Sequence, residues 1–189
     1  IQLGYSSSGE VVKVGKGVSE FHVGDKVVSN GSHAEYVVVN ENLCSRIDQN
    51  TDIKEASFTV LGSIALHGLR LSGTSLGSKV VVIGLGVIGQ LVCRLAEAQG
   101  SEVIGIDTDS ERTKNGDNFY TSIDEVELTN IDAVIITAAS SSNEPIEIAT
   151  KIARNKAKIV VIGDIPLNIS RNDFYYKELE LVVSKSYGP

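Results

Sequence analysis

Three glycines and one acid between positions 79 and 107 are the residues whose types and spacing point most clearly to chemistry. Gly84, Gly86 and Gly89 follow a β-branched run, Lys79–Ile83, and begin a segment whose apolar residues recur at helical spacing. A helix that starts at such a turn directs its first amide groups and the positive end of its dipole toward an anion. Strand, G-x-G-x-x-G turn and helix in this order predict a site for the pyrophosphate of a dinucleotide.

The acid supports the same interpretation. A second β-rich run, Glu102–Ile106, ends on Asp107, close to the spacing of about 20 residues expected for the acid that hydrogen-bonds an adenosine ribose. A 2′-phosphate beside this carboxylate would meet a repulsion of up to about 4 kcal/mol at an effective dielectric constant of about 20. The sequence therefore favours NAD over NADP as the cofactor. The nearby Arg112 is the one residue that could weaken this preference.

Each glycine has a separate expected role in this site. Gly84 permits the tight turn, Gly86 lets the backbone approach the pyrophosphate, and Gly89 allows the helix and the strand to pack closely. Adenine and ribose should lie at the end of the second strand, and nicotinamide near the ends of two later strands, at the carboxyl edge of the sheet. The predicted cofactor-binding residues are Gly84, Gly86, Val87, Ile88, Gly89, Asp107, Thr108, Thr137, Ala138 and Gly163.

The rest of the second half continues this alternation of strands and helices. A helix is expected from about Pro145 to Ala153, with Asn143 as a candidate cap. The pattern predicts an α/β fold of the Rossmann type, a doubly wound parallel sheet with helices on both faces, over residues 76–189. Its later strands are expected at 133–137, 158–162 and 179–184.

The first region has a different texture, because short β-rich runs alternate there with turn residues. It predicts a small antiparallel barrel or sandwich over residues 1–50. Asp52 is a plausible cap for a short helix, and an apolar segment follows from Leu61 to Leu71, so residues 51–75 are expected to form bridging helices. The β-rich runs lie at 10–14, 26–28 and 34–39.

Two segments are too short for this architecture. The segment from Ser110 to Asn130 should hold a helix, a strand and another helix, but it contains the run Asn115-Gly116-Asp117-Asn118 and leaves little room. A second abrupt junction is Ser29-Asn30-Gly31-Ser32. We hypothesise that residues are missing at one or both places. Because the chain opens on Ile1 and contains no methionine, we also expect a fragment or a processed chain.

Composition excludes several classes of partner. The 17 basic and 24 acidic side chains give a net charge of −7 without a long run of either sign, which argues against nucleic acid or an anionic membrane. No apolar stretch approaches the roughly 20 residues of a spanning helix, and the start has no signal-peptide pattern, so a cytoplasmic location is expected. Cys44 and Cys93 lack metal or redox spacing and are expected to be packing residues.

Several ordered motifs carry a family resemblance. Gly9-Glu10-Val11-Val12-x-Val14-Gly15, Phe21-x-Val23-Gly24-Asp25-Lys26-Val27 and Ala34-Glu35-Tyr36-Val37, followed by the glycine turn, resemble the medium-chain dehydrogenase/reductase superfamily of zinc-type alcohol dehydrogenases. The resemblance implies a partial GroES-like β-barrel domain followed by a Rossmann domain. It also implies a homodimer, with the last strand, near 181–183, available to extend the sheet.

A narrower resemblance comes from the second half. The pieces Ile136-Thr137-Ala138-Ala139, Val161-Ile162-Gly163-Asp164 and Phe174-Tyr175-x-Lys177-Glu178-Leu179, with the ending Ser186-Tyr187-Gly188-Pro189, are similar to bi-domain oxidoreductases. In that subgroup a Gfo/Idh/MocA-type sugar-dehydrogenase domain follows such a dehydrogenase. The resemblance thus implies a further domain beyond this chain.

The zinc ligands of the superfamily are not retained at the positions that the resemblance assigns to them. Gly4-Tyr5-Ser6 stands where a Gly-His-Glu belongs, and the bridging segment has Val60-Leu61-Gly62 where a cysteine belongs. A catalytic zinc needs three protein ligands, so we predict that no metal is bound. The catalytic residues stay unknown. Tyr5 and Ser6 are candidates by position, and of the two histidines His67 is a better candidate proton relay than His33, although both are most simply structural.

The leading hypothesis is an NAD-dependent oxidoreductase that moves hydride to or from a hydroxyl or carbonyl carbon of a small, sugar-like substrate. One alternative is a zinc-free quinone or enoyl reductase that uses NADPH, which Asp107 disfavours. Another alternative is a non-catalytic NAD-binding scaffold or redox sensor. The first two differ in cofactor preference, and the third predicts binding without turnover.

Overall fold

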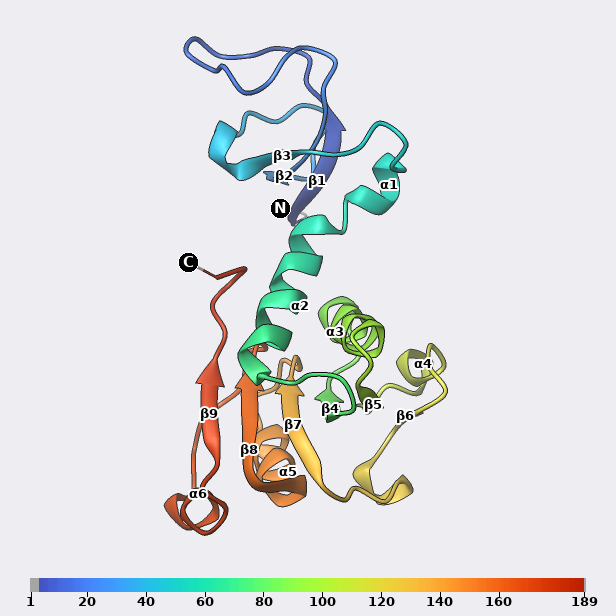
Figure 1. Ribbon diagram of the computed structural model, residues 1–189, viewed down its shortest axis with the longest axis vertical. Coiled ribbons are helices and arrows are strands. Elements are labelled where there is room, and N and C mark those ends of the chain that lie inside the picture. Colours follow the sequence, from blue (N-terminus) through green and yellow to red (C-terminus); the bar gives the residue numbers. More distant parts are fainter. Residues whose placement is uncertain (1–3, 189) are drawn as a thin grey trace. The chain divides into compact units, whose positions relative to one another are not determined.

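The computed structural model describes residues 4–188, which form two compact units, Ile1–Ser63 and Ile64–Pro189 (Figure 1). Pro189, the last residue of the motif quoted for the narrower resemblance, lies outside the described residues. The first unit contains a three-stranded antiparallel sheet in the order β1-β2-β3. Its elements are β1 Tyr5–Glu10, β2 Lys26–Ser32, the 3-10 helix η1 Glu41–Leu43, β3 Cys44–Arg46 and α1 Ile53–Ala56.

Serine hydroxyls of β1 connect this sheet to the α1 region. Ser6 donates to the carbonyl oxygen of Ser57, and Ser8 donates to that of Ile53. The predicted cap is confirmed, because the Asp52 carboxylate accepts a hydrogen bond from the backbone amide of Lys54 at 2.6 Å. The chain thus returns to β1 at residues 53–57.

Two β-rich runs of this unit were placed wrongly. The first strand begins at Tyr5 and ends at Glu10, so most of the run 10–14 lies outside it, and residues 34–39 form no strand at all. β-branched composition alone does not form a strand; a hydrogen-bonding neighbour is also needed. Within the described residues β2 is paired on both sides by β1 and β3, and the 34–39 segment is paired with no strand. Tyr36 and Val38 remain exposed there.

The second unit confirms the predicted doubly wound α/β fold. Six parallel strands follow the order β6-β5-β4-β7-β8-β9, so the chain starts in the centre and winds outward in both directions. Alternate residues of β4 enter two separate cores: Val80 and Val82 pack with α2 and α3, whereas Val81 and Ile83 pack with α5. The strands are β4 Lys79–Ile83, β5 Glu102–Ile106, β6 Phe119–Tyr120, β7 Ile131–Ile136, β8 Ala153–Val161 and β9 Glu180–Val183.

The remaining helices of the described residues are α2 and those of the second unit. The helix α2, Thr59–Ser72, runs from the first unit into the second, and a Cβ placed on its Gly68 would overlap the side chain of Ile162. This glycine lets α2 approach the sheet closely. The other helices of the second unit are α3 Val87–Ala98, α4 Ser110–Thr113, the 3-10 helix η2 Ile123–Glu125, α5 Glu144–Ile152 and α6 Arg171–Lys177.

Polar side chains fix the two ends of α5 in different ways. Asn143 occupies the N-cap position as predicted, but its side chain makes no capping bond and instead bonds Glu147 and Asn168. At the other end the Lys177 ammonium group donates to three carbonyl oxygens, those of Thr150, Lys151 and Ala153, at 2.7, 2.9 and 2.9 Å. This lysine fixes α6 to the junction between α5 and β8.

The segment 110–130 contains only short elements, in agreement with the shortage noted in the sequence. It holds the four-residue α4, the two-residue β6 and the three-residue η2 in place of full helices (Figure 1). Between residues 4 and 188, no helix is long and apolar enough to cross a membrane.

Candidate functional site

The glycine turn joins β4 to α3 with the geometry that the sequence predicted. Gly84 adopts φ 98°, a conformation that side chains with a Cβ rarely adopt, and its amide donates to the carbonyl of Ile106 at 2.8 Å. Gly86 is the N-cap of α3, with φ −63° and ψ −174°. Val87, the first helical residue, is 53% exposed, so the start of the helix is open to a ligand. Ile88 packs on the core that α3 covers.

Close packing explains the other two glycines. A Cβ on Gly89 would overlap the carbonyl oxygen of Gly84 and approach the Thr137 hydroxyl at 2.7 Å. A Cβ on Gly163 would overlap the backbone of Ala138. These contacts bring the ends of β4, β7 and β8 together with the first turn of α3, so five predicted residues meet at one edge of the sheet. By contrast, a Cβ on Gly86 would meet nothing within 4 Å, which leaves room for a ligand.

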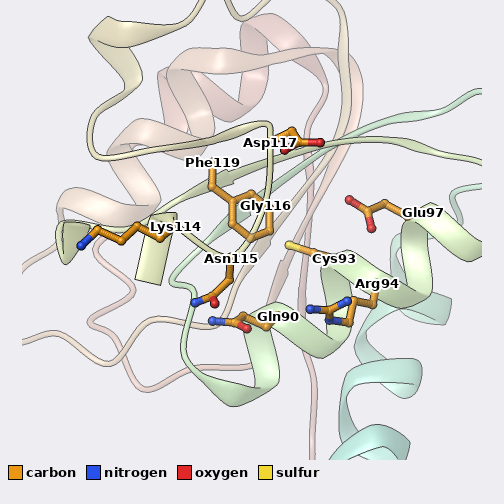
Figure 2. A pocket seen from close by; sticks show the side chains of 9 residues that line it. All are labelled: Gln90, Cys93, Arg94, Glu97, Lys114, Asn115, Gly116, Asp117 and Phe119. Carbon is orange, nitrogen blue, oxygen red and sulfur yellow. The ribbon is translucent and has the colours of Figure 1, made fainter. Parts of the chain in front are cut away.

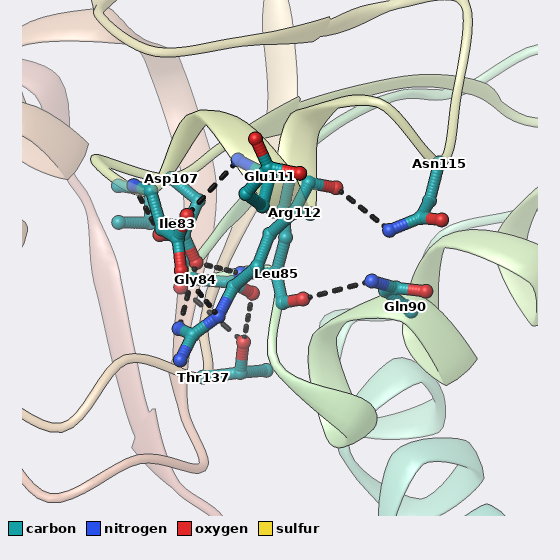
Figure 3. Close-up of polar contacts among 10 residues, drawn as sticks. Ile83, Gly84, Leu85, Gln90, Asp107, Glu111, Arg112, Asn115 and Thr137 are labelled. Atoms are coloured by element: carbon teal, nitrogen blue, oxygen red, sulfur yellow. Dashed lines mark hydrogen bonds and ion pairs between the residues drawn. The ribbon is translucent and has the colours of Figure 1, made fainter.

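Asp107 ties the end of β5 to the same turn (Figure 3). Its side chain is buried, with a relative exposure of 8% for the residue. One carboxylate oxygen accepts from the amide of Leu85 at 2.6 Å, and the other accepts from the amide of Asp109 at 2.9 Å. Burial opposes ionisation, but the two backbone hydrogen bonds and Arg112 outweigh it and hold the pKa of Asp107 below its ordinary value. The group is therefore a carboxylate at neutral pH.

Two further side chains support this arrangement. Arg112 reaches from α4 and places its guanidinium 3.3 Å from Asp107 and 3.4 Å from Asp109 (Figure 3). Gln90, on the first turns of α3, donates its amide to the carbonyl oxygen of Leu85 at 3.1 Å. Leu85 is thus held through both its amide and its carbonyl. Sequence reasoning missed the Leu85 and Gln90 contacts, because a backbone amide leaves no signal in the residue type at its position.

The remaining predicted residues lie just after the ends of β5, β7 and β8. The Thr137 hydroxyl donates to the carbonyl of Gly84 at 2.5 Å, and the amides of Ala138 and Gly163 donate to the ends of the neighbouring strands at 3.1 and 3.0 Å. The Thr137 side chain therefore braces the turn. Thr108 follows Asp107 and is exposed.

Comparisons with known proteins match both units. Residues 1–49 match the family described as the alcohol dehydrogenase GroES-like domain, and residues 49–172 match the NAD binding domain of the D-isomer specific 2-hydroxyacid dehydrogenases. The galactitol-1-phosphate dehydrogenase from Escherichia coli has a TM-score of 0.86 at 23% identity, over 98% of this chain and 68% of that chain. The GroES-like start, followed by this nucleotide-binding half, decides the family. The chain belongs to the medium-chain dehydrogenase/reductase superfamily of zinc-type alcohol dehydrogenase-like proteins.

Among the curated relatives are proteins named dehydrogenases and others named D-xylulose reductases. The sorbitol dehydrogenase of Halalkalibacterium halodurans is 24% identical over 239 residues, which cover 100% of this chain and 69% of that protein. The D-guloside 3-dehydrogenase of Escherichia coli (strain K12) is 35% identical over 115 residues, 59% of this chain and 33% of that protein. The chain thus spans between a third and about two thirds of the length of these relatives.

The length of the first match also bears on the two short segments. The matched region extends over 239 residues, whereas this chain has 189, so the relative carries additional residues inside that region. The comparison does not place these residues in either short segment, so the hypothesis of missing residues there stays a prediction. Because the larger part of the chain, residues 49–172, belongs to a family of NAD-binding domains, the cofactor of this superfamily member is a nicotinamide dinucleotide.

Tyr5 and Ser6 stand where the family resemblance places zinc ligands, and the structure describes their surroundings. Tyr5 is 45% exposed, and Ser6, at 6% exposure, has φ 90° and a hydroxyl that donates to Ser57. His33 lies within 3.1 Å of the Ser6 carbonyl oxygen, which agrees with a structural role. In the second unit, a Cβ on Gly188 would lie 3.1 Å from the ring of His67. No group of three or more histidine, cysteine, aspartate or glutamate side chains that could hold a metal is present in the described part of the chain.

A pocket of about 350 Å³ lies apart from the glycine turn, between α3 and the loop that follows α4 (Figure 2). None of the ten predicted cofactor residues lines it. Cys93 points its sulfur toward this pocket, and burial raises the pKa of the thiol to about 12. The lining residues are Gln90, Cys93, Arg94, Glu97, Lys114, Asn115, Gly116, Asp117 and Phe119.

Proposed function

We propose that this protein is an NAD-dependent, zinc-independent oxidoreductase that transfers hydride to or from a hydroxyl or carbonyl carbon. The observation that carries the proposal is the Asp107 carboxylate, which is held by the amide of Leu85 inside the glycine turn. One contact thus joins the expected ribose site to the expected pyrophosphate site. The bound dinucleotide would supply the hydride chemistry, and the protein would supply binding, orientation and electrostatics.

The preference for NAD rests on the acceptors that Asp107 keeps. A carboxylate has about four lone-pair sites, and two backbone amides and Arg112 occupy some of them, so acceptor capacity remains for ribose hydroxyls. A 2′-phosphate in the same place would face the negative charge. The opposing feature is Arg112, which is 51% exposed and could turn to meet a phosphate. A fold neighbour from Sinorhizobium meliloti 1021 is described as bound to NADP, so both cofactors must be tested.

The proposed substrate is a small polyol or sugar-like molecule. Support comes from the names of relatives, which include sorbitol dehydrogenase and D-guloside 3-dehydrogenase. Because Tyr5, Ser6 and Val60–Gly62 replace the zinc ligands of the superfamily, hydrogen-bond donors would have to stabilise the developing alkoxide charge. The Ser6 hydroxyl already donates to Ser57, so Tyr5 is the better candidate of the two.

A titration with NADH and NADPH tests the cofactor. We expect NADH to bind at least about tenfold more tightly, since a tenfold ratio requires only 1.4 kcal/mol of the estimated repulsion. Asp107→Asn should weaken NADH binding by about 10- to 100-fold, as expected for the loss of hydrogen bonds to a charged group, and should reduce the preference. Asp117→Asn, an exposed carboxylate on the loop after α4, is the control. Equal affinity of the Asp107 variant and the unchanged protein would disprove the ribose assignment.

An activity screen separates the enzyme from a scaffold. The protein is mixed with NAD⁺ and a panel of polyols and glycosides, and NADH formation is followed by absorbance with and without a chelator. Turnover that persists with the chelator supports a zinc-independent enzyme. Binding of NADH without turnover on the whole panel would favour the non-catalytic scaffold, and turnover only with NADPH and enones or quinones would favour the reductase.

Assembly and location are further parts of the proposal. β9 is an edge strand of the described sheet, and Val183 on it is 59% exposed, so this edge could pair with a second copy in a homodimer. We expect a small-molecule substrate, no nucleic-acid or membrane partner, a cytoplasmic location, and a Gfo/Idh/MocA-type domain attached in the full-length protein, as in the bi-domain oxidoreductases. Light scattering of the purified full-length protein and the sequence of its complete gene test the dimer and the attached domain.

A further inference from the structure

Successive peptide units of the glycine turn are fixed by different partners. The unit between Gly84 and Leu85 is held on both sides. Its carbonyl oxygen, that of Gly84, accepts from the Thr137 hydroxyl at 2.5 Å, and its amide, that of Leu85, donates to the Asp107 carboxylate at 2.6 Å. Residues at the ends of two neighbouring strands therefore prevent this unit from rotating.

Gln90 holds the next two units. Its backbone amide donates to the Gly86 carbonyl at 3.0 Å, and its half-buried side-chain amide donates to the Leu85 carbonyl at 3.1 Å (Figure 3). Among residues 4–188 this side-chain contact is the one hydrogen bond that the unit between Leu85 and Gly86 makes, since the Gly86 amide donates to no group there. The orientation of that unit therefore depends on the Gln90 side chain.

The glycine at position 86 makes this unit easy to rotate. Gly86 is the N-cap of α3, with φ −63° and ψ −174°, and a Cβ there would meet nothing within 4 Å. Because glycine adopts positive φ about as readily as negative φ, the peptide unit before it can turn over at little steric cost. The residue type that lets a pyrophosphate approach thus leaves the neighbouring amide without a fixed direction.

The Gln90 contact sets that direction. In a trans peptide unit the carbonyl and the N–H point opposite ways, and none of the described peptide bonds is cis. Because the Leu85 carbonyl points toward the Gln90 side chain, the Gly86 N–H points away from it. Beside this N–H lie the amides of Val87 and Ile88, which a helix start leaves without intrahelical partners. Unpaired N–H groups at a helix start are donors for an anion.

We infer that Gln90 is a positioning residue for the pyrophosphate of the dinucleotide, because its hold on the Leu85 carbonyl directs the Gly86 N–H toward a phosphate oxygen. This inference rests on the proposed function. Gln90 acts through the backbone: its side-chain amide already bonds Leu85, and the residue lines the pocket beside α3, which contains no predicted cofactor residue. Without this contact the carbonyl could turn outward, where it would repel the phosphate.

The test compares ligands with and without the pyrophosphate. NAD⁺ and ADP-ribose carry it, whereas adenosine does not, so adenosine cannot use the Gly86 N–H. Gln90→Met keeps the length of the side chain and removes the donor. It should weaken the binding of NAD⁺ and ADP-ribose by about 3- to 10-fold, the effect of one hydrogen bond, and leave adenosine affinity within about twofold. Calorimetry measures the first two affinities, and ligand-observed NMR measures the third.

Gln99 provides the matched control in the same helix. At the other end of α3, its side-chain amide donates to the hydroxyls of Thr74 and Ser101, both at 3.1 Å. Gln99→Met should lower the thermal midpoint at least as much as Gln90→Met, because it removes two hydrogen bonds. It should leave the affinities for all three ligands unchanged. The pair of variants thus separates a loss of stability from a loss of positioning.

Gln90→Glu adds a pH profile and serves as a second variant if Gln90→Met does not fold. An ionised glutamate has no donor, so at pH 7 the variant should bind NAD⁺ at least as weakly as Gln90→Met does. A protonated glutamic acid can donate to the Leu85 carbonyl, so NAD⁺ affinity relative to the unchanged protein should recover as the pH falls toward about 5. The same ratio for Gln90→Met should stay constant with pH.

The outcomes distinguish this inference from the proposed function. Unchanged NAD⁺ affinity of Gln90→Met, an equal loss for NAD⁺ and adenosine, or a loss in Gln90→Glu that does not vary with pH would overturn the positioning role and leave the proposed function intact. Failure of the unchanged protein to bind NAD⁺ would overturn the proposed function, and the positioning role with it.

Discussion

The crossover from β4 to β5 contains a twelve-residue helix with four buried residues, whereas the crossover from β5 to β6 contains a four-residue helix with none. Both lead from one parallel strand to the next in the same sheet. In the first, Val92, Cys93 and Ala96 of α3 are buried on the strands. In the second, the ring of Phe119 provides packing that the short α4 does not. This ring lies so close to Gly105 that a Cβ on Gly105 would overlap it.

The difference between the two crossovers indicates which part of the fold forms the predicted nucleotide site. The glycine turn, α3 and Asp107 all belong to the first crossover or to the strands it joins, and the second crossover contributes Arg112 and the amide of Asp109, which both contact the Asp107 carboxylate. The second crossover leaves a pocket of about 350 Å³ beside α3, lined by polar and charged groups. We therefore expect NADH binding to depend mainly on the complete crossover, and the short one to affect mainly stability.

Substitution of the glycines should give the largest effects and should separate folding from binding within the first crossover. Gly89→Ala places a Cβ against the carbonyl of Gly84 and is expected to destabilise the protein by about 3 kcal/mol and abolish NADH binding. Gly86→Ala adds a Cβ in open space, so it should leave stability within about 0.5 kcal/mol and still weaken NADH binding at least tenfold. Chemical denaturation and NADH titration of both variants measure this.

Two outcomes would disprove the predicted contrast between Gly86→Ala and Gly89→Ala. If Gly86→Ala unfolds the protein as readily as Gly89→Ala does, the open space beside Gly86 is not real. If Gly86→Ala binds NADH normally, the pyrophosphate does not approach the turn there. Gly62→Ala, at a half-buried position in the first turn of α2 where a Cβ would meet nothing within 4 Å, is the control and should be neutral or stabilising by up to about 1 kcal/mol.

The stability of the second crossover should depend on the ring of Phe119. Phe119→Ala is expected to cost about 2–3 kcal/mol, because the half-buried ring fills the space beside Gly105 and Gly116. NADH affinity should stay within about twofold, since the pocket that Phe119 lines contains none of the predicted cofactor residues. Tyr120→Phe, in which the neighbouring ring is kept, is the control. A loss below about 0.5 kcal/mol would show that the loop is held by other contacts.

The same contrast explains what the sequence could predict. The turn at 84–89 and Asp107 were found because strand, glycines, helix and acid follow one another locally, and each leaves a mark in residue type. The segment 110–130 could only be recognised as too short, since no periodicity says how a loop packs once its helix is absent. The Leu85 amide escaped prediction, because its role depends on which partner the fold brings near. The strand assigned to 34–39 failed because pairing is a non-local property.

The acid at the end of the first crossover should also give a pH dependence. Asp107 has a pKa held below its ordinary value in the folded protein, so its ionised form stabilises the fold above pH 3.8 and that contribution is lost as the pH falls through the folded-state pKa. Asp107→Asn should therefore cost about 2 kcal/mol at pH 7 and less at pH 3, as measured by urea denaturation. Asp117→Asn in the second crossover should change stability little at either pH, because it is exposed. A constant cost for Asp107→Asn from pH 7 to pH 3 would contradict the assigned hydrogen bonds.

The smallest effect is expected in the reaction of Cys93 with a thiol reagent. This reaction reports directly on the contact between α3 and the loop of the short crossover. This thiol belongs to α3 but faces the loop of the short crossover, and its pKa of about 12 leaves roughly one thiolate in ten thousand at pH 8. Iodoacetamide should therefore label Cys93 in the native protein far more slowly than in urea, and NADH should change the native rate little. Phe119→Ala should accelerate labelling at Cys93 and leave Cys44, in the other unit, unaffected. If Cys93 reacts in the native protein as fast as in urea, the loop after α4 opens freely, and the pocket beside α3 is not a fixed feature of the fold.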